Sequence, residues 1–208
     1  MKNIFILLLL ISLILCSFNV NAQRSRHKGS LPKLSLGVKA GINYAGQSTS
    51  DATELNVKKI MRLNGGVYLN YFLLKNLAVQ PEVQISGKGV HWTDPYSDGK
   101  DLLTYIDVPF MIKYQPVKML NIQAGPDFGY RLSAKQTVDA GPKVNIGEYY
   151  KKTDMGFAFG MEANLPFRLN ISLRYVLGLT SVTAQYSEAW KNNYFQISVG
   201  YRLVDIIK

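Results

Sequence analysis

Residues 169–179 read LNISLRYVLGL, and apolar and polar side chains alternate along almost the whole stretch. Ile171 and Leu173 would lie on one face of a strand, and Ser172 and Arg174 on the other. Alternation with a period of two predicts a β-strand whose two faces meet different surroundings. The length matches the roughly 9–11 residues that a tilted transmembrane strand needs. Because similar stretches recur along the chain, the sequence predicts a membrane β-barrel.

Eight stretches carry this alternation. They span residues 34–44, 61–71, 77–85, 102–114, 119–132, 154–165, 169–179 and 194–203. The connections alternate between long and short, and the long ones are 46–59, 86–101, 133–151 and 180–193. Bacterial outer-membrane barrels have an even number of strands, short periplasmic turns and longer outer loops. We therefore predict an all-β fold, an eight-stranded antiparallel up-and-down transmembrane barrel, with its long loops outside the cell.

The N-terminus has the features of a cleaved signal peptide. Lys2 precedes an apolar run over residues 4–15, and small residues precede Gln23 at the expected cleavage site. A membrane anchor is the alternative, but the run is shorter than the ~20 residues of a spanning helix. Cys16 is the chain's one cysteine, and it would leave with the signal. The expected parts are a signal peptide at 1–22, a periplasmic tail at 23–33, the barrel at 34–203 and a C-terminal tail at 204–208.

Composition argues against two other classes of protein. No apolar run of about 18 residues follows residue 22, which excludes a helical membrane protein. The formal charge of +10 is dispersed through strands and loops, whereas a nucleic-acid-binding face would cluster its basic residues. The expected partners are outer-membrane lipid, the barrel-assembly machinery during insertion, and a protein bound by the outer loops, with no nucleic acid.

The placement of aromatic residues decides which face of the strands points outwards. A soluble lipocalin-like barrel would turn the apolar face inwards. Aromatic residues on that face fall near both ends of the strands, as expected for the two interfacial girdles of a membrane barrel. The predicted girdle residues are Tyr44, Tyr71, Tyr114, Tyr130, Phe195 and Tyr201. Three prolines inside strands, Pro81, Pro109 and Pro126, predict local bulges.

The other face carries charges of both signs. An eight-stranded barrel has room for side chains but hardly for a channel, so charges inside it must pair. The predicted lumen network is Lys39, Arg62, Glu82, Asp107, Lys113, Asp127, Arg131, Asp154, Glu162, Arg174 and Arg202. Asp107 and Asp127 should lie close together, with Arg131, Arg174 and Arg202 as the available cations. A salt-bridged plug is the favoured interpretation, and a narrow polar pore is the alternative.

The sequence predicts no catalytic, cofactor-binding or metal site. Of the two histidines, His27 lies in the tail, and only His91 has a serine and a carboxylate nearby, Ser97 and Asp94. The glycine pair at residues 37 and 41 lies in a predicted strand and would relieve crowding in a narrow interior. We therefore expect a non-enzymatic scaffold or surface interaction module. A small-solute channel is one alternative, and a barrel enzyme acting on lipid or peptide is another.

Seven segments together resemble the PorT-type outer-membrane β-barrel family of Gram-negative bacteria. They are GVKAGINYA (37–45), VQPEVQISGKG (79–89), YIDVPFMIKY (105–114), IQAGPDFGYRL (122–132), MGFAFGMEANL (155–165), LRYVLGLTSV (173–182) and NYFQISVGYRL (193–203). The resemblance implies the barrel fold and an outer-membrane location, and it implies no ligand. One member has a role in secretion, which is not carried over. The tail at 204–208 departs from the common ending of outer-membrane proteins on an aromatic residue.

Overall fold

The computed structural model describes residues 33–49, 56–139, 141–184 and 189–207 of the 208-residue chain. The predicted signal peptide, its cleavage site and nearly all of the predicted periplasmic tail lie outside these residues. Within the described part, no helix is long and apolar enough to cross a membrane.

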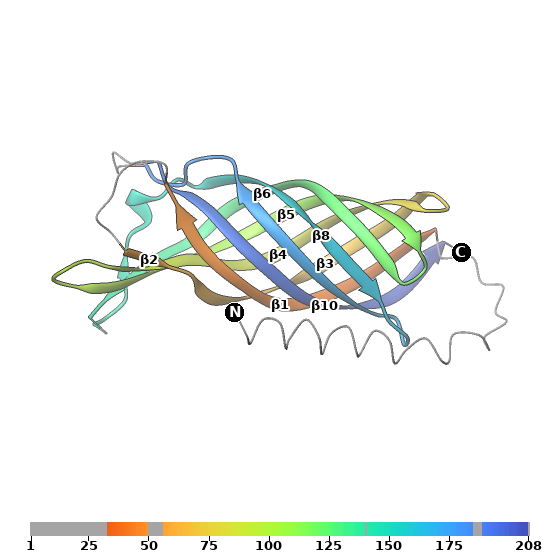
Figure 1. The fold of residues 1–208 in the computed structure, drawn as a ribbon, viewed down its shortest axis with the longest axis horizontal. Coiled ribbons are helices and arrows are strands. Elements are labelled where there is room, and N and C mark those ends of the chain that lie inside the picture. The colour runs from red at the N-terminus through yellow and green to blue at the C-terminus, as the bar shows by residue number, and fades with distance from the viewer. Residues whose placement is uncertain (1–32, 50–55, 140, 185–188, 208) are drawn as a thin grey trace, which may run out of the picture. The chain divides into compact units, whose positions relative to one another are not determined.

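Eight long strands form a closed ring (Figure 1). They are β1 Leu34–Ser48, β3 Ile60–Leu74, β4 Leu77–Thr93, β5 Asp98–Val117, β6 Leu120–Val138, β8 Thr153–Asn164, β9 Leu169–Gly178 and β10 Lys191–Ile207. Each strand pairs antiparallel with the next, and β10 pairs with β1 to close the ring. Three short elements lie in the connections: β2 Asn56–Lys58, β7 Val144–Asn145 and the 3-10 helix η2 Gly147–Tyr149. The predicted eight-stranded up-and-down fold is confirmed.

The two ends of the barrel differ in their connections. One end, here called the turn end, has the short connections 75–76, 118–119 and 165–168. The opposite end, the loop end, carries the connections that include β2, β7 and η2. The first strand of the barrel begins at the turn end and the last strand ends there, because Leu34 at the start of β1 pairs with Ile207 at the end of β10.

The apolar face points outwards and the polar face inwards. Leu173 and Ile197 are 45% and 57% exposed, whereas Arg174 and Gln196 next to them are each 1% exposed. This pattern continues around the ring, since the exposed large hydrophobic residues come from every long strand. The soluble alternative, which needs an apolar interior, is therefore wrong.

The strands extend further at the loop end than the sequence predicts. Residues 86–101, expected to be a loop, continue β4 and β5 and leave only residues 94–97 as a turn. Figure 1 shows this hairpin reaching beyond the other strands, with β2 paired to β4 near its end. Beyond the membrane both faces of a strand can meet water or loops. The apolar alternation therefore stops there, although the backbone pairing continues.

The bulges expected at the prolines are absent. Pro81 pairs with Phe110, and Gln84 pairs with Asp107 in the same register. Pro109 and Pro126 likewise lie in ladders whose register is unchanged on either side. A proline removes one donor from the ladder, but the pairs that flank it hold the two strands in place.

Candidate functional site: the barrel lumen and its outer loops

A layer of ion pairs fills the lumen in the half nearer the turn end. Arg174 donates to both oxygens of Glu82, with Nη1–Oε2 at 2.9 Å and Nη2–Oε1 at 2.6 Å. Lys39 Nζ donates to Glu82 Oε2 at 2.7 Å. The side chains of all three residues are at most 4% exposed. The planar guanidinium fork fits a carboxylate with two hydrogen bonds, so this contact is both strong and directional.

A third ion pair completes this turn-end layer. Lys113 Nζ lies 2.5 Å from Glu162 Oε1 and 2.9 Å from Gln80 Oε1. Gln80 in turn donates to Glu82 Oε1 at 2.7 Å, which links the Lys113–Glu162 pair to the two ion pairs of Glu82. The turn-end layer, defined as Lys39, Glu82, Lys113, Glu162 and Arg174, thus contains three cations and two carboxylates in one hydrogen-bonded network.

Nearer the loop end lies a second layer with the opposite balance of charge. Lys88 Nζ lies 3.0 Å from Asp107 Oδ1 and 3.1 Å from Asp154 Oδ2. The hydroxyl of Tyr194 donates to Asp127 Oδ2 at 2.7 Å and lies 3.3 Å from Asp107 Oδ2. This loop-end layer, Lys88, Asp107, Asp127, Asp154 and Tyr194, therefore holds one lysine among three carboxyl groups, all buried.

Contacts in both layers cross the full width of the barrel. Strands β4 and β9 are separated by three strands on either side of the ring, and so are β5 and β10. Glu82 of β4 binds Arg174 of β9, and Asp107 of β5 meets Tyr194 of β10. The lumen is therefore bridged wall to wall at two levels.

Loops fold into the loop end of the lumen and form an apolar cap. Its residues come from β5, β6 and the two connections that follow β6 and β9: Leu103, Tyr105, Ala134, Ile146, Tyr150 and Val182. The hydroxyl of Tyr150 donates to the buried Asp101 Oδ2 at 2.6 Å and so ties the cap to β5. The cap meets the loop-end layer at Lys88, which pairs with Leu103 and whose ammonium stands 4.5 Å from the centre of the Tyr105 ring.

Three predicted lumen cations lie elsewhere. Arg131 donates to the backbone carbonyls of Gly147, Tyr150 and Lys151, and thereby supports the connection that contains η2. Arg202 lies 3.1 Å from Asp205 of its own strand. Arg62 is only partly buried and packs beside Gly87.

The cation that approaches Asp107 is Lys88, which lies in a stretch that the sequence predicts to be a loop. The expectation of Arg131, Arg174 or Arg202 beside Asp107 and Asp127 is wrong for direct contact, since Lys88 binds there. Continuing the inward alternation of Glu82, Gln84 and Ser86 by one step would have reached Lys88. The remaining predicted residues, Lys39, Glu82, Asp107, Lys113, Asp127, Asp154, Glu162 and Arg174, are buried in the lumen.

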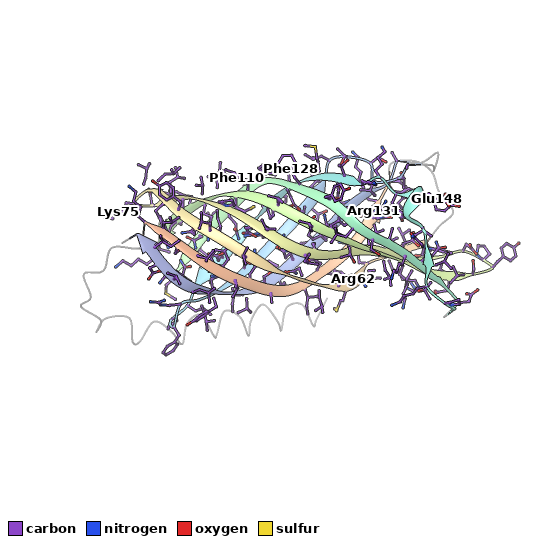
Figure 2. All side chains as sticks on the ribbon, turned by 180° about the vertical axis from the view of Figure 1, so that it is seen from behind. Arg62, Lys75, Phe110, Phe128, Arg131 and Glu148 are labelled. Atoms are coloured by element: carbon purple, nitrogen blue, oxygen red, sulfur yellow. The ribbon has the colours of Figure 1, made fainter. Side chains whose placement is uncertain are left out.

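The predicted girdle residues lie on the outer wall. Tyr44, Tyr114, Tyr130, Phe195 and Tyr201 are 43–50% exposed, and Tyr71 is partly buried. The Lys59 ammonium stands 4.9 Å above the Phe195 ring and 5.5 Å above the Tyr44 ring at the loop end. Figure 2 shows Phe110 and Phe128 projecting from the wall between Lys75 at the turn end and Arg131 at the loop end.

The histidine candidate does not form a hydrolytic triad. His91 Nε2 lies 2.7 Å from Asp98 Oδ2, whereas Ser97 Oγ donates to Asp94 Oδ2 at 3.0 Å. The hydrogen bond with His91 holds the pKa of Asp98 below its usual value, and the Tyr96 backbone N–H lowers the pKa of Asp94. These contacts stabilise the exposed tip of the β4–β5 hairpin. Among the described residues no group of three His, Cys, Asp or Glu side chains is arranged to hold a metal ion.

A sequence model of the outer membrane protein beta-barrel domain matches residues 21–184. The chain belongs to this family. Its fold, its outward apolar band and its family together make it an outer-membrane protein. No curated protein matches the chain.

Solved outer-membrane barrels have the same fold. The Neisserial surface protein A is 12% identical with a TM-score of 0.54, over 82% of this chain and 99% of that one. Ail, the attachment invasion locus protein of Yersinia pestis, is 15% identical with a TM-score of 0.51, over 83% of this chain and 100% of its own. At such low identity the likeness shows the fold alone.

Proposed function

We propose that this protein is a non-enzymatic outer-membrane barrel with a sealed lumen, which presents its outer loops as a surface for interaction. The observation that carries the proposal is the ion pair between Arg174 and Glu82, which spans opposite strands while almost fully buried. A conducting pore needs a continuous wet path. The turn-end layer, the loop-end layer and the apolar cap each interrupt such a path.

The described part of the loop end has the backbone pairing that an interaction surface needs. The β4–β5 hairpin is held by β2 on one side and by β6 on the other. Arg131 fixes the connection around η2 through three backbone carbonyls. A surface that is ordered before binding loses less conformational entropy on binding, which favours recognition of a partner.

Two finer assignments belong to the same proposal. Within its family the chain is of the PorT type, on the strength of the seven segments given above. During insertion its partner is the barrel-assembly machinery, because the strands expose backbone groups until the ring closes. Neither assignment implies a role in secretion.

Conductance in planar bilayers tests the sealed lumen. We expect the purified barrel to insert without single-channel steps, under conditions in which an open porin reconstituted in parallel conducts. Regular steps from the wild-type barrel would replace the proposal with its alternative, a narrow small-solute channel.

Crosslinking in intact cells tests the interaction surface. A photoreactive residue at Tyr96, which is 95% exposed at the hairpin tip, is expected to capture a specific partner. The matched control is Phe167, 86% exposed in a turn-end connection. Identical products from both positions would contradict an interaction surface at the loop end. Hydrolysis of lipid or peptide that is lost in His91→Ala would instead favour an enzyme.

A further inference from the structure

A notch in the outer wall opens where β9 ends before its neighbour β8. The last pair between these strands is Gly156 with Gly178, whereas β8 continues to Thr153. The chain beyond β9 turns onto β8, and Leu179 N donates to Met155 O at 2.8 Å. A hollow of about 580 Å³ opens here between β6, β8 and this turn.

The lower part of the hollow is apolar and belongs to the lipid-facing wall. Phe128 and Met155 are register partners on β6 and β8, and they are 46% and 41% exposed. The next pair on the same outer face towards the loop end is Tyr130 with Thr153. Because Tyr130 belongs to the aromatic girdle, the hollow lies at the level of the membrane interface, where lipid headgroups reside.

The upper part of the hollow offers a positive charge and hydroxyl groups. The residues that line it are Lys151, Thr153, Thr180 and Ser181, and Gly129 and Asp154 line the hollow between its two parts. The buried carboxyl group of Asp154 is engaged in the lumen, where its Oδ2 lies 3.1 Å from Lys88 Nζ. Thr180 Oγ1 already accepts a hydrogen bond from Met155 N at 2.9 Å, so its hydroxyl proton can be donated to a ligand. An ammonium with several hydroxyl donors is suited to an anion with several acceptor oxygens, such as a phosphate.

The backbone that carries Lys151 is fixed before any ligand arrives. Lys151 N donates to Val182 O at 2.7 Å, and Arg131 Nε donates to Lys151 O at 3.1 Å. Arg131 N donates to Lys152 O at 2.7 Å, which joins the same segment to β6. The backbone on this side of the hollow is therefore held by hydrogen bonds before a ligand binds, which lowers the entropic cost of binding.

We infer that this hollow binds the phosphorylated headgroup of a lipid in the outer leaflet. The phosphate lies against Lys151 and the hydroxyls, and an acyl chain runs along Phe128 and Met155. The apolar lower part distinguishes this site from one for a free anion, because inorganic phosphate would leave that surface without a partner. The inference does not rest on the proposed function, since a channel or an enzyme could carry the same lipid.

Native mass spectrometry of the whole barrel in detergent tests the inference. The probes are lipid A, which is a phosphorylated glycolipid, the same lipid after enzymatic removal of its phosphates, and inorganic phosphate. We expect lipid A to bind with at least about fivefold higher affinity than the dephosphorylated lipid, since one lysine near the membrane surface contributes about 1 kcal/mol to the binding of an anionic lipid. Equal affinity for both lipids, or binding of inorganic phosphate as tight as that of lipid A, would overturn the inference.

Two variants locate the binding. Lys151→Gln should reduce the affinity for lipid A about fivefold and leave that for the dephosphorylated lipid unchanged. Lys143→Gln is the matched control, because Lys143 is exposed in the same connection but does not line the hollow. Thr153→Val, which keeps the charge and removes one hydroxyl, should weaken lipid A binding as well. Equal effects of Lys151→Gln and Lys143→Gln would place the binding elsewhere. Each variant is first checked for the barrel's heat-modifiable mobility on gels.

Discussion

At the scale of single residues, Glu82 is the central hydrogen-bond acceptor of the turn-end layer. It accepts hydrogen bonds from Arg174, Lys39 and Gln80, and its side chain is fully buried. A buried carboxylate is stable only while its partners remain, since desolvation of an unpaired charge costs several kcal/mol. The stability of this layer therefore depends more on the pairing of its charges than on their number.

Arg174→Ala should lower the free energy of unfolding by about 3–5 kcal/mol, because it leaves a buried carboxylate with one cation fewer. Lys191→Ala is the control, since Lys191 is only partly buried at the loop end and its loss should cost about 0–1 kcal/mol. Urea titrations of both variants in the same lipid measure the difference. Equal stabilities would show that the lumen charges are solvated, which would favour a pore. A double-mutant cycle with Glu82→Gln should give a coupling energy clearly above zero.

Lys88→Met should make the stability of the barrel respond more strongly to acidification than that of the wild type. Without its lysine, the loop-end layer keeps Asp107, Asp127 and Asp154, whose negative charges repel one another. Protonation removes this repulsion, so the variant should gain more stability than the wild type as the pH falls from 7 towards 4, because the wild type keeps a lysine that already offsets part of the repulsion. Unfolding at several pH values, with the exposed Lys100→Met as control, measures the two slopes. Parallel slopes for all three proteins would contradict the role assigned to Lys88.

At the scale of elements, the membrane-spanning strands could be predicted closely and their outer extensions could not. All eight long strands overlap their predicted ranges, because the lipid imposes the same alternation on each of them. Outside the membrane that signal disappears, so the sequence predicts a loop over residues 86–93 and 98–101, where the structure has strands. Lys88 is missing from the predicted lumen network for the same reason, because a residue expected in a loop is not counted among the inward-facing side chains of a strand.

The β4–β5 hairpin depends on one glycine in its first strand. Gly89 has a φ of +140°, and a Cβ there would lie 2.0 Å from Asp101 O. Gly89→Ala should therefore cost about 1–3 kcal/mol locally and loosen the hairpin beyond it. Gly65→Ala is the control, because its Cβ would meet Lys39 O at an ordinary 3.5 Å. Hydrogen exchange should speed up at residues 90–103 in Gly89→Ala alone, and unchanged exchange there would refute the assignment.

At the scale of the whole molecule, the two ends of the barrel should face different compartments. Cysteines at Asp98 and Gly141 on the loop end are expected to react with a membrane-impermeant maleimide in intact cells. Cysteines at Lys75 and Phe167 on the turn end should react only after the outer membrane is opened. The described residues contain no native cysteine that would add background. The reverse pattern of labelling would invert the orientation of the barrel.

The seam between β1 and β10 sets the order in which this barrel can become complete. Every other ladder of the eight-stranded ring joins long strands that follow one another in the chain, whereas Gln47 and Asn192 at the seam are 145 residues apart. Seven hairpin ladders can form locally, but until the eighth forms the sheet has two open edges whose backbone groups lipid cannot satisfy. Across the same seam Gln196 donates a hydrogen bond to Asn43, which lies 153 residues away in the chain. The hydrogen-bond network of the lumen is therefore incomplete until β1 and β10 pair. Any chain that lacks one of the two seam strands would therefore be an open sheet, with neither a lipid-compatible outside nor a packed inside.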